Sequence, residues 1–231
     1  IALQNDSLNL ITLVSPSPNF NERRPNYVII HYTEEANCDS ALITLTDGKS
    51  NRKVSANYLI CKDGTVYHLV NDLFRAWQAG ISKWGSITDI NSISLGIEID
   101  NNGHETFTTE QIKSLLVLLS YLKKTFHIPV TNFIGHADVA PTRRGDPGEY
   151  FPWQQLAQHG FGYWHDADTT LVSPPENFND TLALRLIGYD VSNYPAAVVA
   201  FKRHFVQTDI ADTIGEADRK ILYNVFQKYL R

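Results

Sequence analysis

The chain has 231 residues, of which 43% are hydrophobic and 19% are charged, with two cysteines. This length and apolar content allow one large domain, or one domain with a small addition, around a sizeable core. The net charge of −5 and the scattered basic residues argue against nucleic acid as a partner. No apolar run approaches the roughly 20 residues of a transmembrane segment. Because the chain begins with Ile1 and has no methionine, we expect any targeting segment to have been removed.

The first half of the chain predicts strands with one short helix. Residues 1–26 are polar and contain three prolines, which predicts an irregular lead-in that wraps the domain. Residues 27–32 form the first predicted strand, residues 40–46 have helical spacing, and residues 57–61 and 65–70 form a hairpin around Asp63-Gly64. We interpret Cys61 as a small buried residue and Cys38 as part of a loop or helix start, with a disulfide between them as the alternative.

The middle of the chain completes a predicted α/β fold. Residues 94–100 are a buried strand in which branched apolar residues flank Glu98. Residues 109–126 are predicted as a helix, with a capping box from Thr108 to Gln111, and Pro129 follows its end. Residues 130–134 return as a strand. Strands and helices interleave without strict β-α-β alternation, so we predict a mixed central β-sheet flanked by helices.

The composition changes after residue 165, where acidic residues, threonines and prolines predict a linker. Residues 181–187, 194–205 and 216–230 have the spacing of three short amphipathic helices, which predicts a small C-terminal domain. The predicted boundaries are 1–26 for the lead-in, 27–165 for the main domain, 166–178 for the linker and 179–231 for the three-helix domain. The nearly balanced charge of this last part argues against a polyanionic ligand.

Residues 134–148 contain a candidate metal site. His136 and Asp146 stand at the two ends of a stretch rich in glycine and proline, residues that fix backbone angles rather than fill a core. His31, near the end of the first predicted strand, offers a third ligand. Two imidazoles and a carboxylate are ligands that Zn²⁺ accepts in catalytic sites, where the fourth position is left for water. Spacing alone leaves open that these are three unrelated polar residues.

Two further charged residues are candidates for chemistry beside such a metal. A carboxylate in an apolar strand is either paired or functional, and near zinc Glu98 would take a proton from water and pass it to a leaving amine. Arg144, two positions before Asp146, would face the oxyanion that forms when a carbonyl is attacked, with a solvated loop cation as the alternative. We interpret Arg143 as structural or exposed.

Short motifs between residues 27 and 164 together resemble the type 2 N-acetylmuramoyl-L-alanine amidases, and among them the AmiD-type enzymes. This family shares its fold with the peptidoglycan recognition proteins. The motifs are Ile30-His31-Tyr32-Thr33, Ser55-Ala56-Asn57-Tyr58, Ala76-Trp77-Gln78-Ala79-Gly80, Gly96-Ile97-Glu98-Ile99, Gly135-His136-Ala137-Asp138-Val139-Ala140-Pro141, Asp146-Pro147-Gly148 and Phe151-Pro152-Trp153.

The resemblance implies a hydrolase with one Zn²⁺ per chain that cuts the amide between the lactyl group of N-acetylmuramic acid and the L-alanine of a peptidoglycan stem peptide. It puts His31, His136 and Asp146 on the zinc ligands and Glu98 on the acid/base residue. It also implies peptidoglycan or muropeptides as partners, a role in cell wall turnover, and a periplasmic or outer-membrane location. Residues 179–231 resemble the three-helix peptidoglycan-binding domain that follows AmiD-type amidase domains.

The chain departs from the family pattern at three positions. Arg144 stands where relatives usually have lysine, and because a guanidinium does not donate its proton at neutral pH, we expect oxyanion binding rather than proton transfer there. Asn57 and Gln78 stand where relatives often carry histidine, which we expect to bear on substrate preference and not on metal binding.

Two other functions remain open from the sequence. One is a protein that recognises the same muropeptide without cutting it, although such relatives lose a zinc ligand and this chain keeps all three. The other is a zinc peptidase acting between amino acids, which the missing H-E-x-x-H motif weakens.

Overall fold

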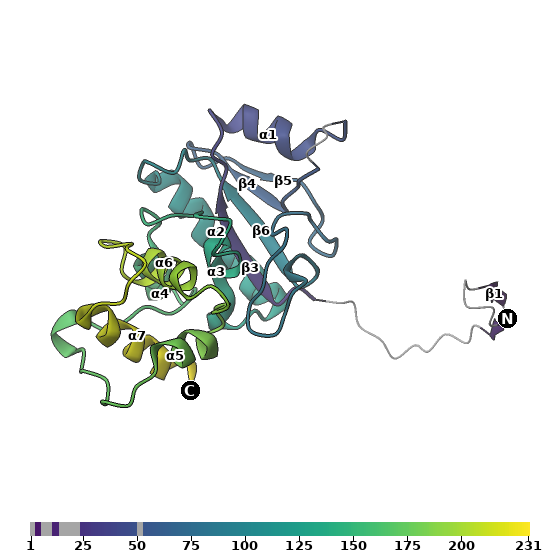
Figure 1. Ribbon diagram of the computed structural model, residues 1–231. Coiled ribbons are helices and arrows are strands. Elements are labelled where there is room, and N and C mark those ends of the chain that lie inside the picture. Colours follow the sequence, from purple (N-terminus) through teal and green to yellow (C-terminus); the bar gives the residue numbers. More distant parts are fainter. Residues whose placement is uncertain (1–2, 6–10, 14–23, 50–52) are drawn as a thin grey trace.

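A mixed five-stranded sheet organises the chain, and its strand order is β5-β4-β6-β3-β7 (Figure 1). The computed structural model describes residues 3–5, 11–13, 24–49 and 53–231. Strands β4 (Tyr58–Ile60), β6 (Ser94–Ile99), β3 (Tyr27–Tyr32) and β7 (Phe133–Gly135) run parallel, and β5 (Val66–His68) pairs antiparallel with β4. The predicted α/β class with a mixed sheet is confirmed.

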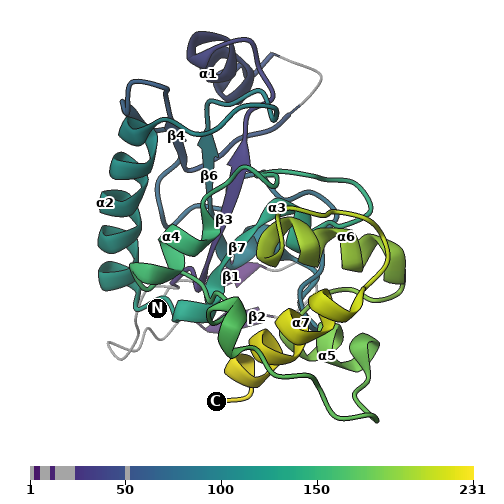
Figure 2. The ribbon, with the colours of Figure 1, turned by 90° about the vertical axis from the view of Figure 1, so that its left-hand side faces the viewer.

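Both faces of the sheet are covered, which explains the continuous apolar run Val28-Ile29-Ile30 in β3. Successive side chains of a strand point to opposite faces, so Val28 and Ile30 of β3 pack with α2 (Thr109–Phe126) and α4 (Trp153–Gln158). Ile29 and Ile134 pack on the other face with α3 (His136–Val139) and the C-terminal helices. Figure 2 shows α2 and the C-terminal helices on opposite sides of the sheet.

The C-terminal helices are α5 (Asp180–Ile187), α6 (Tyr194–Phe205) and α7 (Glu216–Tyr229), close to the three predicted ranges. Helix α5 contacts both α6 and α7, and α6 contacts α3. Their apolar faces join Ile29 and Ile134 of the sheet in one buried cluster. These helices therefore share a core with the face of the sheet that carries the candidate metal site.

Long, strongly periodic elements lie where the sequence predicts them. Helix α2 has the predicted bounds and the predicted capping box, in which Gln111 N–H donates to Thr108 Oγ1 and Thr108 N–H donates to Gln111 Oε1. Its buried apolar residues repeat at helical spacing and pack on the sheet: Ile112, Leu115, Leu119 and Leu122.

Short elements differ from the predictions. The strand predicted over residues 130–134 begins only at Phe133, because Val130–Asn132 form a 3₁₀ turn. Helices α3 and α4 were not predicted, because four and six residues are too few to show a helical period. Most of the predicted lead-in lies outside the described residues, but β1 (Leu3–Asn5) and β2 (Ile11–Leu13) pair with each other in it.

The interpretation of the two cysteines as unbridged is wrong. Cys38 and Cys61 form a disulfide, with their Cα atoms 5.4 Å apart. Cys38 begins α1 (Cys38–Thr46), and Cys61 directly follows β4. Twenty-three positions of separation in the sequence did not reveal this proximity, because the two segments meet only in the folded sheet. The disulfide ties α1 to the end of a central strand.

Asp100, directly after β6, is 3% exposed, and its Oδ1 atom has no hydrogen-bond partner among the described residues. Burial raises the pKa of Asp100, although Lys62 acts in the opposite direction. A carboxyl whose pKa is higher in the folded than in the unfolded state contributes stability at low pH, and this contribution is lost as the pH rises through the folded-state pKa. The ionised side chain therefore costs folding free energy at neutral pH.

We expect the substitution Asp100→Asn to raise the free energy of unfolding at pH 7, by on the order of 1 kcal/mol, because it removes a buried charge and keeps an acceptor oxygen. The gain should shrink as the pH is lowered from 7 to 4, because the raised pKa makes Asp100 take up a proton more readily than an ordinary carboxyl. Urea denaturation of both proteins at the two pH values measures this difference. An equal gain at both pH values would show that ionisation of Asp100 has no part in it.

Candidate metal site and cleft

Three of the polar residues singled out by the sequence, His31, Glu98 and His136, lie at the carboxyl ends of three neighbouring parallel strands. His31 of β3 stands directly opposite Glu98 of β6 in the sheet register. Gly135 ends β7, and His136 begins α3 immediately after it. In open α/β sheets, ligands bind outside the carboxyl ends of the strands. Sheet pairing therefore brings residues from distant parts of the sequence to one edge.

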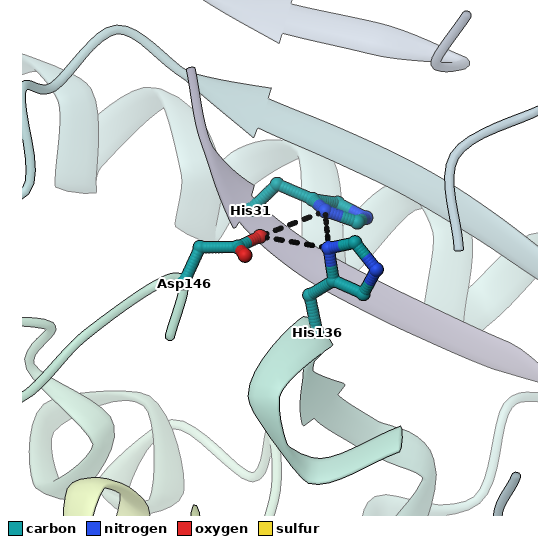
Figure 3. Close-up of side chains that lie close together, drawn as sticks. All are labelled: His31, His136 and Asp146. Carbon is teal, nitrogen blue, oxygen red and sulfur yellow. Dashed lines mark hydrogen bonds and ion pairs between the residues drawn. The ribbon is translucent and has the colours of Figure 1, made fainter. Parts of the chain in front are cut away.

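His31, His136 and Asp146 converge on one point (Figure 3). Asp146 Oδ2 lies 3.0 Å from Nδ1 of His31 and 3.0 Å from Nδ1 of His136, and the two Nδ1 atoms are 2.9 Å apart. All three side chains are buried. The structure thus brings together the three residues that the sequence proposed as ligands.

The outer nitrogens of both imidazoles are hydrogen-bond donors. His31 Nε2 lies 2.6 Å from Gln78 Oε1, and His136 Nε2 lies 3.1 Å from the carbonyl oxygen of Ala79. Both partners are acceptors, so each Nε2 carries the proton. A neutral imidazole has only one N–H, and each Nδ1 therefore presents a lone pair towards Asp146.

The orientation of the Gln78 amide is itself fixed by its neighbours. The hydroxyl of Ser94 donates to the carbonyl of Ile90 at 2.7 Å, so Ser94 Oγ accepts from Gln78 Nε2 at 2.8 Å. The oxygen end of the Gln78 amide must then face His31. This chain of directed hydrogen bonds sets the tautomer of His31 from within the sheet.

The three convergent atoms fit a single divalent metal ion. Two imidazole lone pairs and a carboxylate oxygen repel one another at 3 Å unless a cation lies among them. Donors of a tetrahedral ion bound at 2.0–2.1 Å would lie roughly 3.3 Å apart, close to the separations found here. Histidine ligands held through their second nitrogen by an acceptor are also characteristic of metal sites.

Asp146 is held in its ionised form. Burial acts to raise the pKa of Asp146. Without a cation among the donors, His136 and His31 outweigh this effect when they carry a proton on Nδ1, and they then hold the pKa of Asp146 well below its ordinary range. The carbonyl of Asp146 also accepts from Ala137 N–H at 2.8 Å. This bond joins the segment that carries Asp146 to the helix that begins with His136.

The sequence missed the contact of Gln78 with a proposed metal ligand. We expected this position to bear on substrate preference and not on metal binding, whereas its amide directly supports His31. Gly96 of β6 makes room for it, since a Cβ atom there would lie 2.5 Å from Gln78 Cγ. The contact crosses between two segments, so no local pattern in the sequence could reveal it.

We expect Gln78→Leu to weaken metal binding by about 10- to 100-fold, the cost typical of losing an outer hydrogen-bond partner of a ligand. Gln78→Glu is the matched control, because it keeps an acceptor oxygen for His31 Nε2. Competition with a chromophoric chelator measures the metal dissociation constant of each variant. A dissociation constant for Gln78→Leu equal to that of the control would remove Gln78 from this role.

A cleft opens beside the three donors. Its lining includes Glu98, Arg144 and Trp77, the last with half of its surface exposed. Helix α1 forms part of the opposite wall, through Thr44 and Leu45. Both candidate catalytic residues of the sequence therefore lie in one cleft with the proposed metal ligands.

The two adjacent arginines have different surroundings. Arg143 donates to the backbone carbonyl groups of Ala79 and Ile81, which agrees with the structural role predicted for it. Arg144 lines the cleft, and its Nε atom is buried without a hydrogen-bond partner among the described residues. The guanidinium of Arg144 thus retains hydrogen-bonding capacity for a ligand in the cleft.

Asn57 has a structural position. It is fully buried, its amide nitrogen donates to the carbonyl groups of Val70 and Asn71, and its Oδ1 accepts from Gly96 N–H. These bonds tie β6 to the segment after β5. Asn57 therefore supports the scaffold of the sheet.

A mixed sheet with three convergent candidate metal donors in a cleft beside the carboxyl ends of its parallel strands is the arrangement of an α/β enzyme with a candidate metal site. Residues 21–149 match the Amidase_2 family model, described as N-acetylmuramoyl-L-alanine amidase. AmiD of Escherichia coli strain K12 is 36% identical over 225 residues, which cover 84% of this chain and 79% of AmiD. The chain belongs to the N-acetylmuramoyl-L-alanine amidase family, as the sequence motifs predicted.

Other relatives agree over different lengths. AmpD of Haemophilus influenzae, a 1,6-anhydro-N-acetylmuramyl-L-alanine amidase, is 36% identical over 104 residues, which are 45% of this chain and 56% of AmpD. The structure of E. coli AmiD in complex with anhydro-N-acetylmuramic acid-L-Ala-D-gamma-Glu-L-Lys matches with a TM-score of 0.80 at 31% identity and covers 97% of both chains.

AmpDh3 of Pseudomonas aeruginosa gives a TM-score of 0.81 at 26% identity, over 95% of this chain and all of that chain. The likeness to AmiD and AmpDh3 thus extends through the C-terminal helices. Among the helices in the described ranges, none has the length and apolar character needed to cross a membrane.

Proposed function

We propose that the chain is a zinc-dependent amidase that hydrolyses the bond between the lactyl group of N-acetylmuramic acid and the L-alanine of peptidoglycan stem peptides. One observation carries the metal part of this proposal. His31 and His136 aim unprotonated nitrogens at the carboxylate of Asp146, because both outer nitrogens donate to fixed acceptors. This N₂O donor set suits one Zn²⁺ per chain.

When bound, Zn²⁺ polarises a carbonyl oxygen and lowers the pKa of a water ligand to about 7. Glu98 is positioned to act as the proton carrier, because it lines the cleft and stands beside His31 in the sheet register. Its carboxylate takes a proton from the attacking water and delivers it to the L-alanine nitrogen as that group leaves. Arg144 presents a guanidinium to the oxygen on which negative charge develops.

Muropeptides are the proposed substrates. The structures similar to this chain include AmiD with an anhydro-muramyl tripeptide and AmpDh3 with an anhydromuramic pentapeptide. The cleft beside the donor triad offers a half-exposed aromatic ring, Trp77, on which a sugar ring or a peptide plane can stack.

We further propose that the protein is located at the cell wall. Residues 27–165 would carry the amidase activity, and residues 179–231 would bind peptidoglycan. The Cys38–Cys61 disulfide supports a periplasmic or outer-membrane location, because disulfides persist in oxidising compartments. The proposed peptidoglycan-binding part, residues 179–231, follows the linker at 166–178. Leu182 and Leu186 support this role: they are half exposed and one turn apart on α5.

Zinc content and muropeptide hydrolysis, measured together, test the main proposal. We expect about one zinc per chain, release of free stem peptide, loss of both on chelation and recovery of both when Zn²⁺ is restored. Hydrolysis that persists in fully metal-free protein would contradict the zinc mechanism. Zinc bound without release of stem peptide would instead favour a recognition protein that binds the same muropeptide.

A further inference from the structure

Helix α6 and Gln207, just after its end, contact the segment that carries two of the proposed metal ligands at three points. His204 Nδ1–H donates to Asp138 Oδ2 at 2.8 Å, and Gln207 Nε2 donates to the carbonyl of Phe151 at 2.6 Å. Arg203 lies against Gly145, since a Cβ atom on Gly145 would be 3.5 Å from its Cζ. These three residues, two in α6 and one just after it, contact residues 138–151 of the chain.

Asp138 is the centre of the contact nearest the metal site. Its Oδ2 accepts from Gly135 N–H at 2.7 Å as well as from His204, and its Oδ1 accepts from the hydroxyl of Tyr189 at 2.7 Å. Gly135 and Asp138 bracket His136 in the first turn of α3. The carboxylate of Asp138 therefore fixes the turn that aims His136 into the site.

The two donors from the C-terminal part are themselves rigidly held. The ring of His204 is stacked on Trp153, with ring centroids 3.9 Å apart, and on Phe205, with centroids 4.1 Å apart. Tyr189 is 2% exposed and packs edge-on against Trp84. Hydrogen bonds to a buried carboxylate are strong, and removing one leaves charge without compensation.

We propose that Tyr189 and His204 are positioning residues for the metal site, which act on His136 through Asp138. The C-terminal helices then have a second role besides wall binding: they hold the ligand-bearing turn in the geometry that binds the metal. Arg203 beside Gly145 extends this support towards Asp146. The inference rests on the proposed zinc binding. It extends the set of residues that support the metal site to Tyr189 and His204, which do not line the cleft.

The test uses the full chain with Tyr189→Phe, His204→Leu and the two changes combined. Each removes a hydrogen bond to Asp138 and keeps a side chain of similar bulk. His204→Asn is the conservative variant, since its amide nitrogen can take the place of Nδ1. Val225→Ala, in the buried part of α7, is a control that weakens packing without touching Asp138.

Two quantities are measured: the zinc dissociation constant by chelator competition, and the visible absorption spectrum of the Co²⁺-loaded protein, which reports ligand geometry. We expect zinc binding by the combined variant to weaken about 10- to 100-fold and its Co²⁺ spectrum to change. His204→Asn and Val225→Ala should keep the wild-type values. Comparison with Val225→Ala separates an effect on the site from a general loss of stability.

The outcomes separate this inference from the proposed function. A wild-type chain that binds no zinc overturns both. If the wild-type chain binds zinc and the combined variant has the same dissociation constant and the same Co²⁺ spectrum, the positioning role alone is overturned. An equal loss in Val225→Ala also overturns it, because general destabilisation would then explain the effect.

Discussion

Replacing Glu98 by glutamine is expected to lower kcat by about 10²- to 10⁴-fold, the usual contribution of a general acid/base, while metal content stays unchanged. Glu98 is outside the donor triad, so its loss leaves His31, His136 and Asp146 in place. It nevertheless lines the same cleft and stands opposite His31 in the register of β6 with β3. Glutamine keeps the size of the side chain and removes its ability to accept a proton.

Steady-state hydrolysis of a muropeptide, together with metal analysis of the same sample, separates an effect on turnover from a loss of metal. We expect kcat to fall and KM to change little, since Glu98 acts on the proton and not on substrate affinity. Glu110→Gln, an exposed acid in the first turn of α2, is the matched control. A Glu98→Gln variant with full turnover would exclude Glu98 as the proton carrier.

Replacing His136 by alanine is expected to abolish both stable zinc binding and hydrolysis. The three donor atoms lie 2.9–3.0 Å from one another, so each is one of the three protein ligands of the proposed site. Losing a direct ligand should weaken metal binding by more than the 10- to 100-fold expected for an outer partner such as Gln78. His31→Ala and Asp146→Ala should have the same effect, because each also removes one of the three donor atoms.

Metal content after dialysis and the rate of stem-peptide release are the measurements. The control is His159→Ala, an exposed histidine whose side chain hydrogen-bonds only to the carbonyl of Gln155 among the described residues. Loss of hydrolysis with full zinc content in His136→Ala would place His136 outside the metal site. Retention of both zinc and activity would contradict the proposed ligand set as a whole.

The sequence predicted those parts of the fold that depend on local periodicity. The apolar run of β3 and the helical spacing of α2 have the same bounds in the structure as in the prediction, because each element buries a face that its own residues define. The sequence also proposed His31, His136 and Asp146 as one ligand set, from a strand end and a stretch rich in proline and glycine, and the structure brings the three together. Family motifs then predicted the amidase relationship that the comparisons show.

What the sequence could not predict depends on contacts between distant segments. The Cys38–Cys61 disulfide requires α1 to begin beside the end of β4. The bond from His31 to Gln78 requires a strand end and a loop to cross where Gly96 leaves room. Neither contact has a local pattern, because the groups are brought together only by the assembled sheet.

The parallel pairing of β7 with β3 joins metal binding to folding. It brings together His31 and His136, which are 105 positions apart, so an unfolded chain holds no preformed donor triad. An ion that binds only the folded state stabilises it by mass action, by about 2.7 kcal/mol when free metal is 100 times its dissociation constant. Under the proposed zinc binding, the supply of zinc therefore governs the fraction of folded chains as well as the activity of each one.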